Sequence, residues 1–127
     1  MSDHRSVHAA NLPAPAGPYS PAQVFDRLVF VSGQGATDPA TGRLVGDDIE
    51  SQTEQVLANI RAILEAAGTR MDKLVKTTVF LASHDDFAGM NGVYKKHVGV
   101  VPPARSTVAV KDFPRGVLLE IDAIAHV

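Results

Sequence analysis

The hydrophobic and polar positions of the chain fall into strand-like and helix-like stretches. Short apolar runs bounded by Gly, Pro and Asp predict β-strands, and two longer stretches with apolar residues every three to four positions predict amphipathic helices. The strands are expected at 6–9, 22–25, 28–31, 73–82, 102–110 and 117–125, and the helices at 47–67 and 84–98. This order, a ββα unit repeated loosely twice, predicts one α+β domain over residues 1–127, with about six strands in a mixed sheet. The polar residues 1–12 are expected to be flexible.

The helix predicted at 47–67 has the clearest pattern. Asp47 or Asp48 can cap its start, and Gly68 follows as the expected stop. Its apolar stripe consists of Ile49, Val56, Leu57, Ile60, Ile63, Leu64 and Ala67. The second helix begins after a sequence that resembles a capping box, Ser83 to Asp86. Its inward side chains are expected to be Phe87, Met90, Tyr94 and Val98, with Asn91 beside the edge of that stripe.

The strand Leu28 to Val31 is apolar without a break, which is typical of a strand covered on both faces. Two helices can cover only one face of a six-stranded sheet. Since proteins avoid exposing several hundred square ångströms of contiguous apolar surface, we expect another copy of the chain to cover the second face.

The last third of the chain predicts a hairpin. Two β-type runs, Pro102 to Val110 and Val117 to Ala125, flank the break Lys111 to Gly116. If the connecting loop is symmetric, Arg105 lies opposite Asp122 and Thr107 lies opposite Glu120. Because opposed residues project to the same side, one patch would hold a guanidinium, a hydroxyl and two carboxylates.

This patch has two interpretations. A guanidinium matches a substrate carboxylate in two parallel hydrogen bonds, and a nearby Glu120 can carry a proton to and from water. Alternatively, Arg105 and the carboxylates form a salt bridge that only ties two strands together. Elsewhere, the rigid turn Ala16 to Pro21 presents Tyr19 either as a packed aromatic residue or as a pocket wall, and Gly33 stands at a strand end where a ligand can approach the backbone.

Composition restricts the possible functions. The chain has 127 residues, a net charge of −2 and no basic cluster, so nothing indicates nucleic-acid binding. It contains no cysteine, which removes disulfides and thiolate chemistry. No apolar run approaches the ~20 residues that span a bilayer, and no secretory signal is visible, so we expect a cytoplasmic protein without a membrane partner.

Several short motifs, in order along nearly the whole chain from Pro13 to Ala125, carry a resemblance to a known family. They are Gly17-Pro18-Tyr19, Val31-Ser32-Gly33-Gln34, Ala66-Ala67-Gly68, Val75 to Leu81, Phe87 with Asn91 and Tyr94, Pro103-Ala104-Arg105-Ser106, Leu119-Glu120-Ile121 and Ala123-Ile124-Ala125. In these motifs the chain resembles the RidA family, also called the YjgF family, whose members hydrolyse reactive enamines and imines.

The resemblance implies a chorismate-mutase-like fold, with two helices on one face of the sheet, that assembles as a homotrimer with three clefts between subunits. It implies two catalytic residues, Arg105 holding the carboxylate of a 2-imino acid and Glu120 handling the attacking water. The implied substrate-binding residues are Tyr19, Ser32, Gly33, Asn91 and Thr107. Many relatives carry cysteine where this chain has Thr107, a change that keeps the side-chain size but supplies a better hydrogen-bonding group.

The implied activity is that of a 2-iminobutanoate/2-iminopropanoate deaminase, which releases a 2-keto acid and ammonia. No metal or other cofactor is implied. Two other functions stay open: a non-catalytic regulator that binds a small carboxylate in the same cleft, and an endoribonuclease that inhibits translation. The acidic balance and the lack of a clear His pair in the cleft argue against the second.

Overall fold

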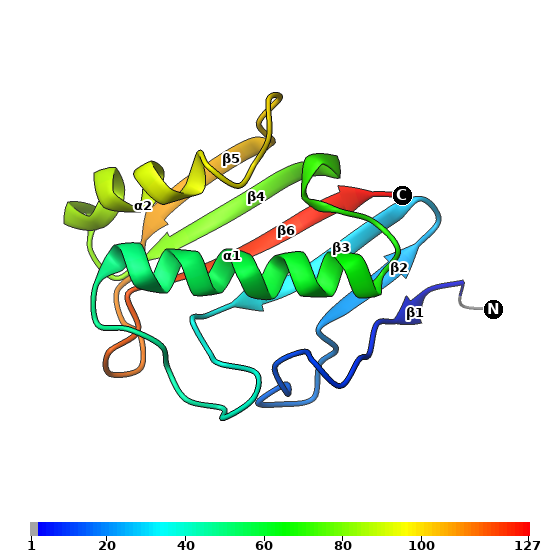
Figure 1. The fold of residues 1–127 in the computed structure, drawn as a ribbon, viewed down its shortest axis with the longest axis horizontal. Coiled ribbons are helices and arrows are strands. Elements are labelled where there is room, and N and C mark those ends of the chain that lie inside the picture. Colours follow the sequence, from blue (N-terminus) through cyan, green and yellow to red (C-terminus); the bar gives the residue numbers. More distant parts are fainter. Residues whose placement is uncertain (1–2) are drawn as a thin grey trace.

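Six strands of the computed structural model, which describes residues 3–127, form one sheet in the order β1-β2-β3-β6-β4-β5 (Figure 1). Their bounds are Arg5–Ser6 (β1), Ala22–Phe25 (β2), Leu28–Gln34 (β3), Leu74–Leu81 (β4), Ala104–Ala109 (β5) and Leu119–His126 (β6). Neighbouring strands are antiparallel except β4 and β5, which are parallel. The predicted α+β class, with a six-stranded mixed sheet, is confirmed.

Two α-helices, α1 (Ile49–Ala66) and α2 (Phe87–Tyr94), lie on the same face of the sheet (Figure 1). Asp48 is the N-cap of α1, because its Oδ1 accepts a hydrogen bond of 2.7 Å from the backbone N–H of Ser51. Gly68 follows α1 with a φ of 88°, a left-handed conformation that favours glycine. Two short 3₁₀ turns, η1 (Met71–Lys73) and η2 (His84–Asp86), precede β4 and α2. The second α-helix is therefore shorter than the predicted range 84–98.

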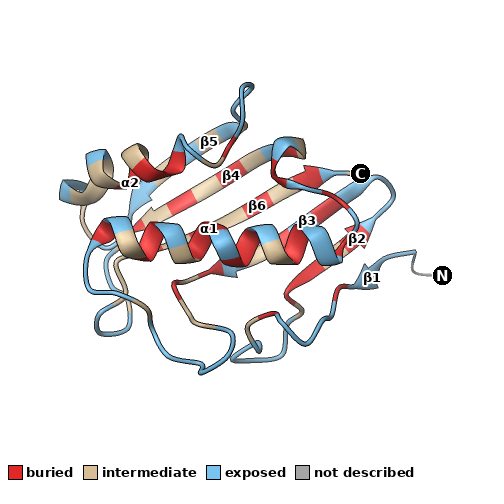
Figure 2. Ribbon diagram, in the orientation of Figure 1, coloured by how far each residue is buried: buried red, intermediate tan, exposed pale blue. Residues whose placement is uncertain are grey.

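The hydrophobic core lies between α1 and the sheet (Figure 2). From α1 it contains Val56, Leu57, Ile60, Ile63 and Leu64, and from β6 it contains Leu119, Ile121, Ala123 and Ala125. In the N-terminal segment expected to be flexible, Val7 and Leu12 are buried, while Met1 and Ser2 lie outside the described residues. None of the helices among residues 3–127 has both the length and the apolar character needed to cross a membrane.

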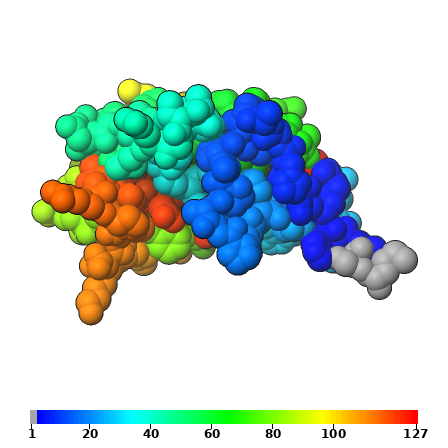
Figure 3. Space-filling model, turned by 90° about the horizontal axis from the view of Figure 1, so that it is seen from below, coloured from blue at the N-terminus to red at the C-terminus, as the bar shows by residue number. Residues whose placement is uncertain are grey.

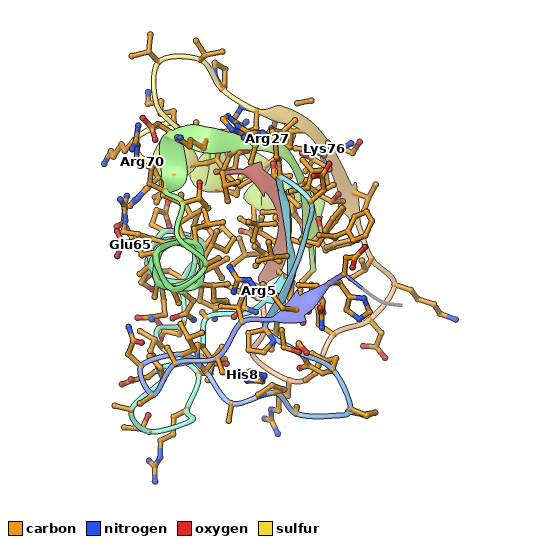
Figure 4. All side chains as sticks on the ribbon, turned by 90° about the vertical axis from the view of Figure 1, so that its right-hand side faces the viewer. Arg5, His8, Arg27, Glu65, Arg70 and Lys76 are labelled. Carbon is orange, nitrogen blue, oxygen red and sulfur yellow. The ribbon has the colours of Figure 1, made fainter. Side chains whose placement is uncertain are left out.

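The face of the sheet away from the helices is open. Along β3, Val29 and Val31 are 0% and 4% exposed under the helices, whereas Leu28 and Phe30, on the other face, are 37% and 40% exposed. With the sheet seen nearly edge-on, α1 lies on one side and Lys76 on the other (Figure 4). A single copy therefore does not cover β3 on both faces, and the expectation that a second copy does so stays a prediction.

The predicted hairpin of β5 and β6 is wrong, because β4 lies between these two strands. Arg105 pairs with Thr77 of β4, and Thr77 pairs on its other side with Ala123, not with Asp122. Thr107 is likewise separated from β6 by Val79, whose partner there is Ile121. The physical reason is the helix between β4 and β5, which gives the long crossover that a parallel strand pair requires.

Candidate functional site

The structure divides the predicted site residues between the two faces of the sheet. Arg105 shares a face with Thr77 and Ala123, which point toward the helices. Glu120 lies three residues before Ala123 on β6, and side chains alternate along a strand, so Glu120 points to the opposite, open face. The single patch predicted from the hairpin register is therefore not formed within one chain.

Glu120 lines a cavity of about 290 Å³ at one end of the sheet. Its other walls include Tyr19, Gly33, Leu44, Pro114 and Val117. Apart from Gly33, which lies on β3, these residues come from three segments that meet on the face shown in Figure 3: the N-terminal segment in blue, the segment around residue 40 in cyan, and the loop before β6 in orange. Two predicted site residues, Tyr19 and Gly33, therefore do lie with Glu120.

The surroundings of Glu120 favour its protonated form. Partial burial raises the pKa of its carboxyl group above the usual value, because the charged form loses hydration. Gly33 leaves the space for this carboxyl group, since a Cβ at that position would lie 3.0 Å from Glu120 Oε1. A carboxyl group with a raised pKa holds its proton more readily and can both accept and return one.

Hydrogen bonds hold the segment that carries Tyr19 against β3. The Ser32 hydroxyl donates to the backbone carbonyl of Ser20 (2.7 Å), and the Ser32 N–H donates to the carbonyl of Pro21 (3.0 Å). The Tyr19 hydroxyl accepts from the N–H of Ala16 (3.2 Å), and the ring is 51% exposed. Ser32 thus fixes the wall of the cavity, and Tyr19 is a pocket wall rather than a core residue.

Arg105 projects from β5 onto the aromatic side chains of α2, and these two elements form the Arg105 shelf. Its guanidinium carbon is 4.8 Å from the centre of the Tyr94 ring and 5.6 Å from that of Phe87. Its Nη1 donates to the sulfur of Met90 at 4.0 Å. Cation–π contacts and a thioether hold the guanidinium in place without neutralising it.

Arg105 has no acidic partner among the described residues. The ion pairs of residues 3–127 join Arg70 to Asp72 and His97 to Glu54. Asp122 instead accepts a hydrogen bond of 3.1 Å from the backbone N–H of Thr78. The interpretation of Arg105 as part of an internal salt bridge is therefore wrong, and its bidentate donors are available for a ligand carboxylate.

Tyr94 supports Arg105 as a neutral phenol. Burial raises the pKa of Tyr94, while the hydrogen bond with Thr77 and the nearby Arg105 charge oppose that shift. The Thr77 and Tyr94 hydroxyls are 2.6 Å apart. Because the phenol stays uncharged near neutral pH, it leaves the positive charge of Arg105 intact.

The two remaining predicted residues lie on the elements of the shelf. Asn91 is half-buried on α2 beside Met90. Thr107 is half-buried on β5, two residues after Arg105 and on the same face. The predicted site residues thus form two groups: Tyr19, Ser32, Gly33 and Glu120 at the cavity, and Asn91, Arg105 and Thr107 at the shelf.

Sequence reasoning missed the contacts that Tyr94 and Met90 make with Arg105. It also missed three cavity walls, Leu44, Pro114 and Val117. The helix pattern between the strands 73–82 and 102–110 was the available signal for the shelf, because a crossover helix predicts parallel pairing of those strands and hence a helix over Arg105. The cavity walls lie in loops, where no periodic pattern exists to place them.

Comparison with known proteins identifies relatives along nearly the whole chain. Residues 9–127 match the family described as Endoribonuclease L-PSP. A RutC family protein of Pyrococcus horikoshii is 48% identical over 120 residues, which are 94% of this chain and 95% of that protein. The goat (Capra hircus) protein named 2-iminobutanoate/2-iminopropanoate deaminase is 43% identical over 121 residues, covering 95% of this chain and 88% of that protein.

The crystal structure of a Yersinia pestis protein of the conserved Rid family superposes with a TM-score of 0.93 at 45% identity, covering 98% of this chain and 99% of that one. The sheet order and helix placement are therefore those of a Rid protein. On sequence and structure together, the chain belongs to the RidA (YjgF) family, which carries the description Endoribonuclease L-PSP.

Proposed function

We propose that the protein is an imine deaminase that hydrolyses 2-iminopropanoate and 2-iminobutanoate to 2-keto acids and ammonia. The observation that carries this proposal is the Glu120 carboxyl group, which lines a cavity and has a pKa raised by burial. Such a group suits proton transfer to and from water. The name of the goat relative supports the same reaction.

The active site of this proposal lies between two subunits of a homotrimer. Arg105 and Glu120 point to opposite faces of one sheet, so they cannot contact the same small molecule within one chain. The open face beside Glu120 also exposes apolar side chains such as Phe30 and Val108, which a neighbouring copy would cover. Arg105 of one subunit then meets Glu120 of the partner subunit.

In this mechanism the uncompensated guanidinium of Arg105 binds the substrate carboxylate and places the C=N carbon beside the cavity. The partner subunit's Glu120 accepts a proton from water as the oxygen of that water bonds to the C=N carbon. Glu120 passes that proton to the imine nitrogen, which gives a neutral carbinolamine. Glu120 then takes the proton of the new hydroxyl group and gives a proton to the amino group, the C–N bond breaks, and ammonia leaves as the C=O bond forms. Thr107 and Asn91 contact the substrate from the Arg105 side, and Tyr19, Ser32 and Gly33 shape the other side. Hydrolysis of this kind uses only water and the two side chains.

Substrate occupancy also protects the base. A guanidinium close to Glu120 would lower the pKa of its carboxyl group and weaken it as a base. A bound substrate carboxylate neutralises that guanidinium, so Glu120 becomes an effective base when substrate occupies the cleft.

We place this activity in the cytoplasm, where dehydratases acting on serine and threonine release such imines.

Direct measurement of imine decay tests the proposal. A serine or threonine dehydratase generates the imine in the cuvette, and the protein is expected to accelerate formation of the keto acid. Glu120→Gln and Arg105→Ala should each abolish this acceleration while sedimentation still shows a trimer. Full activity of either variant would contradict the assigned roles.

Mixing the two inactive variants tests the shared cleft. After exchange of subunits, some clefts combine an intact Arg105 from one chain with an intact Glu120 from its neighbour. With random mixing of equal amounts, about one quarter of the clefts are complete, so about one quarter of the wild-type activity should return. No recovery after confirmed subunit exchange would place both residues in the same chain's site.

The assay also separates the second candidate, a non-catalytic regulator. The observation that favours it is Arg105, whose unpaired guanidinium is sufficient to bind a small carboxylate without catalysis. Binding of a 2-keto acid with no acceleration of imine decay would support the regulator and exclude the deaminase.

A further inference from the structure

Helix α1 buries two amide side chains on the face that it turns to the cavity walls. Gln52 and Asn59 are 0% and 2% exposed. They are seven residues apart, about two helical turns, and therefore lie one above the other on the same side of α1. Buried amides cost free energy unless they are hydrogen-bonded, so their partners show what they hold in place.

Gln52 bonds the loops on one side of the cavity. Its Nε2 donates to the carbonyls of Gly46 (3.1 Å) and Gly116 (2.8 Å), and its Oε1 accepts from the N–H of Leu118 (2.9 Å). The cavity wall Val117 lies between the last two of these partners. Leu118 stands two residues before Glu120, so the same bonds fix the start of β6.

Asn59 forms hydrogen bonds with the segment on the other side of the cavity. Its Nδ2 donates to the carbonyls of Thr37 (2.8 Å) and Gly35 (3.3 Å), both of which line the cavity. Its Oδ1 accepts from Gln55 Nε2 (2.9 Å), so its carbonyl and amino groups are both satisfied.

The two bonded segments enclose the apolar part of the cavity. A Cβ at Gly116 would lie 3.2 Å from the Leu44 side chain, and a bridge joins Leu44 to Thr37. Leu44 is therefore held on the Thr37 side by backbone pairing, whereas the distance of Pro114 and Val117 from Gly35 and Thr37 depends on the two amides.

We propose that Gln52 and Asn59 are positioning residues that set the width of this cavity, and with it the length of the apolar side chain that a 2-imino acid or 2-keto acid ligand can carry. The class of ligand named here is taken from the imine hydrolysis proposed above, so in this respect the inference rests on the proposed function. Neither amide contacts the reacting atoms in this scheme; both act through the wall segments they hold.

Hydrogen exchange tests the clamp without any ligand. Gln52→Met keeps the side-chain volume and removes all three bonds, and it should accelerate amide exchange in residues 114–120 but not in 35–37. Asn59→Leu should show the reverse pattern. Thr53→Val is the matched control, because Thr53 is also 0% exposed on α1 but bonds only the carbonyl of Ile49 in its own helix. Exchange that is unchanged, or raised evenly along the chain, would overturn the clamp.

Ligand selectivity tests the consequence. The ratio of the dissociation constants for pyruvate and 4-methyl-2-oxopentanoate does not depend on the fraction of folded protein, so simple destabilisation leaves it unchanged. Gln52→Met releases the wall, so it should change this ratio by about fivefold, a change typical of one altered apolar contact, and Thr53→Val should leave the ratio unchanged. Local loosening with an unchanged ratio would overturn the role in selectivity.

Two further measurements separate failure of the positioning role from failure of folding and from failure of the proposed deaminase function. If Gln52→Met does not fold, Val117→Ala widens the same wall without touching α1 and must change the ratio; an unchanged ratio overturns the proposal. If Gln52→Met changes the ratio but the wild-type protein does not accelerate imine decay, the proposed deaminase function fails while the positioning role stands.

Discussion

The Glu120 cavity and the Arg105 shelf supply opposite charges by different physical means. Glu120 is partly desolvated, forms no ion pair with the described residues, and has a raised carboxyl pKa. Arg105 is held by two aromatic rings and a thioether, has no anion beside it among the described residues, and keeps its full charge. The cavity therefore suits a carboxyl group that exchanges protons with water, and the shelf suits a guanidinium that does not exchange protons in the reaction.

This difference shows why the two groups belong on opposite faces of one sheet. If they met within a chain, they would form an ion pair that lowers the pKa of the carboxyl group and occupies the guanidinium. Their positions on opposite faces of the sheet, with β4 between β5 and β6, prevent that pairing in the single chain. The following changes test the comparison, from the largest expected effect to the smallest.

Arg105→Ala should have the largest effect on the shelf side. Loss of the carboxylate-binding fork should lower kcat/KM for a 2-imino acid by at least about 100-fold. Arg105→Lys should retain part of the activity, because an ammonium group keeps the charge without the planar fork. The dehydratase-coupled assay measures both, and Arg61→Ala, an exposed arginine on α1, is the control that should behave as wild type.

Gly33→Ala should have a smaller effect on the cavity side. The added Cβ would lie 3.0 Å from Glu120 Oε1 and must displace the carboxyl group by a few tenths of an ångström. A misplaced base should lower kcat on the order of tenfold. Gly35→Ala is the matched control, since its Cβ would meet Glu120 Cγ at an ordinary 4.0 Å; equal losses in both variants would mean that Glu120 is not the group affected.

The pH dependence should report the raised pKa of Glu120. Since the base must be ionised, kcat should fall as the pH decreases through that pKa, at a higher pH than for an ordinary glutamate. An acid limb at or below the usual glutamate range would contradict the desolvated environment.

The same shift has a consequence for stability. Burial disfavours the ionised carboxyl group, and in an Arg105→Ala background no guanidinium opposes this effect. At neutral pH Arg105→Ala should therefore unfold at a lower temperature than the double variant Arg105→Ala, Glu120→Gln. As the pH falls through the raised pKa, the carboxyl group becomes neutral and the difference should close. Thermal unfolding of both proteins across this pH range measures it.

Tyr94→Phe should have the smallest effect. The ring that faces Arg105 remains, so KM should change by less than about threefold. The lost hydrogen bond leaves the buried Thr77 hydroxyl without its partner, which should cost about 1 kcal/mol of unfolding free energy. A rise in KM comparable to that of Arg105→Ala would mean that the phenol contacts the ligand.

Sequence patterns were sufficient where structure is local. The stripe of α1, its cap at Asp48 and the strand pair 22–25 and 28–31 follow from periodicity and turn residues, and the structure confirms them. Tyr19 and Gly33, which the resemblance named with Glu120, line the same cavity as Glu120, and their role in substrate binding stays a prediction.

The pairing of β5 could not be obtained from its own residues. The alternation of side chains along residues 104–109 shows which residues share a face of the strand, but it does not show which strand lies beside it. The next strand along the chain is the commonest neighbour of a strand, but it is not always the neighbour. The position of β5 in the sheet is determined by β4, whose backbone is hydrogen-bonded to a strand on each side, and by helix α2, which connects β4 to β5. The predicted hairpin, which placed Glu120 and Arg105 in one patch of a single chain, was wrong for this reason.

The contact between Arg105 and Met90 determines how the site responds to oxidants. The chain has no cysteine, so peroxide cannot form a sulfenic acid at Thr107. The sulfur beside the guanidinium is the Met90 thioether, which is 0% exposed. A peroxide molecule can reach this sulfur only after α2 opens, so conversion of Met90 to the sulfoxide should be as slow as that opening. The contacts that hold the Arg105 guanidinium should therefore persist under oxidative stress.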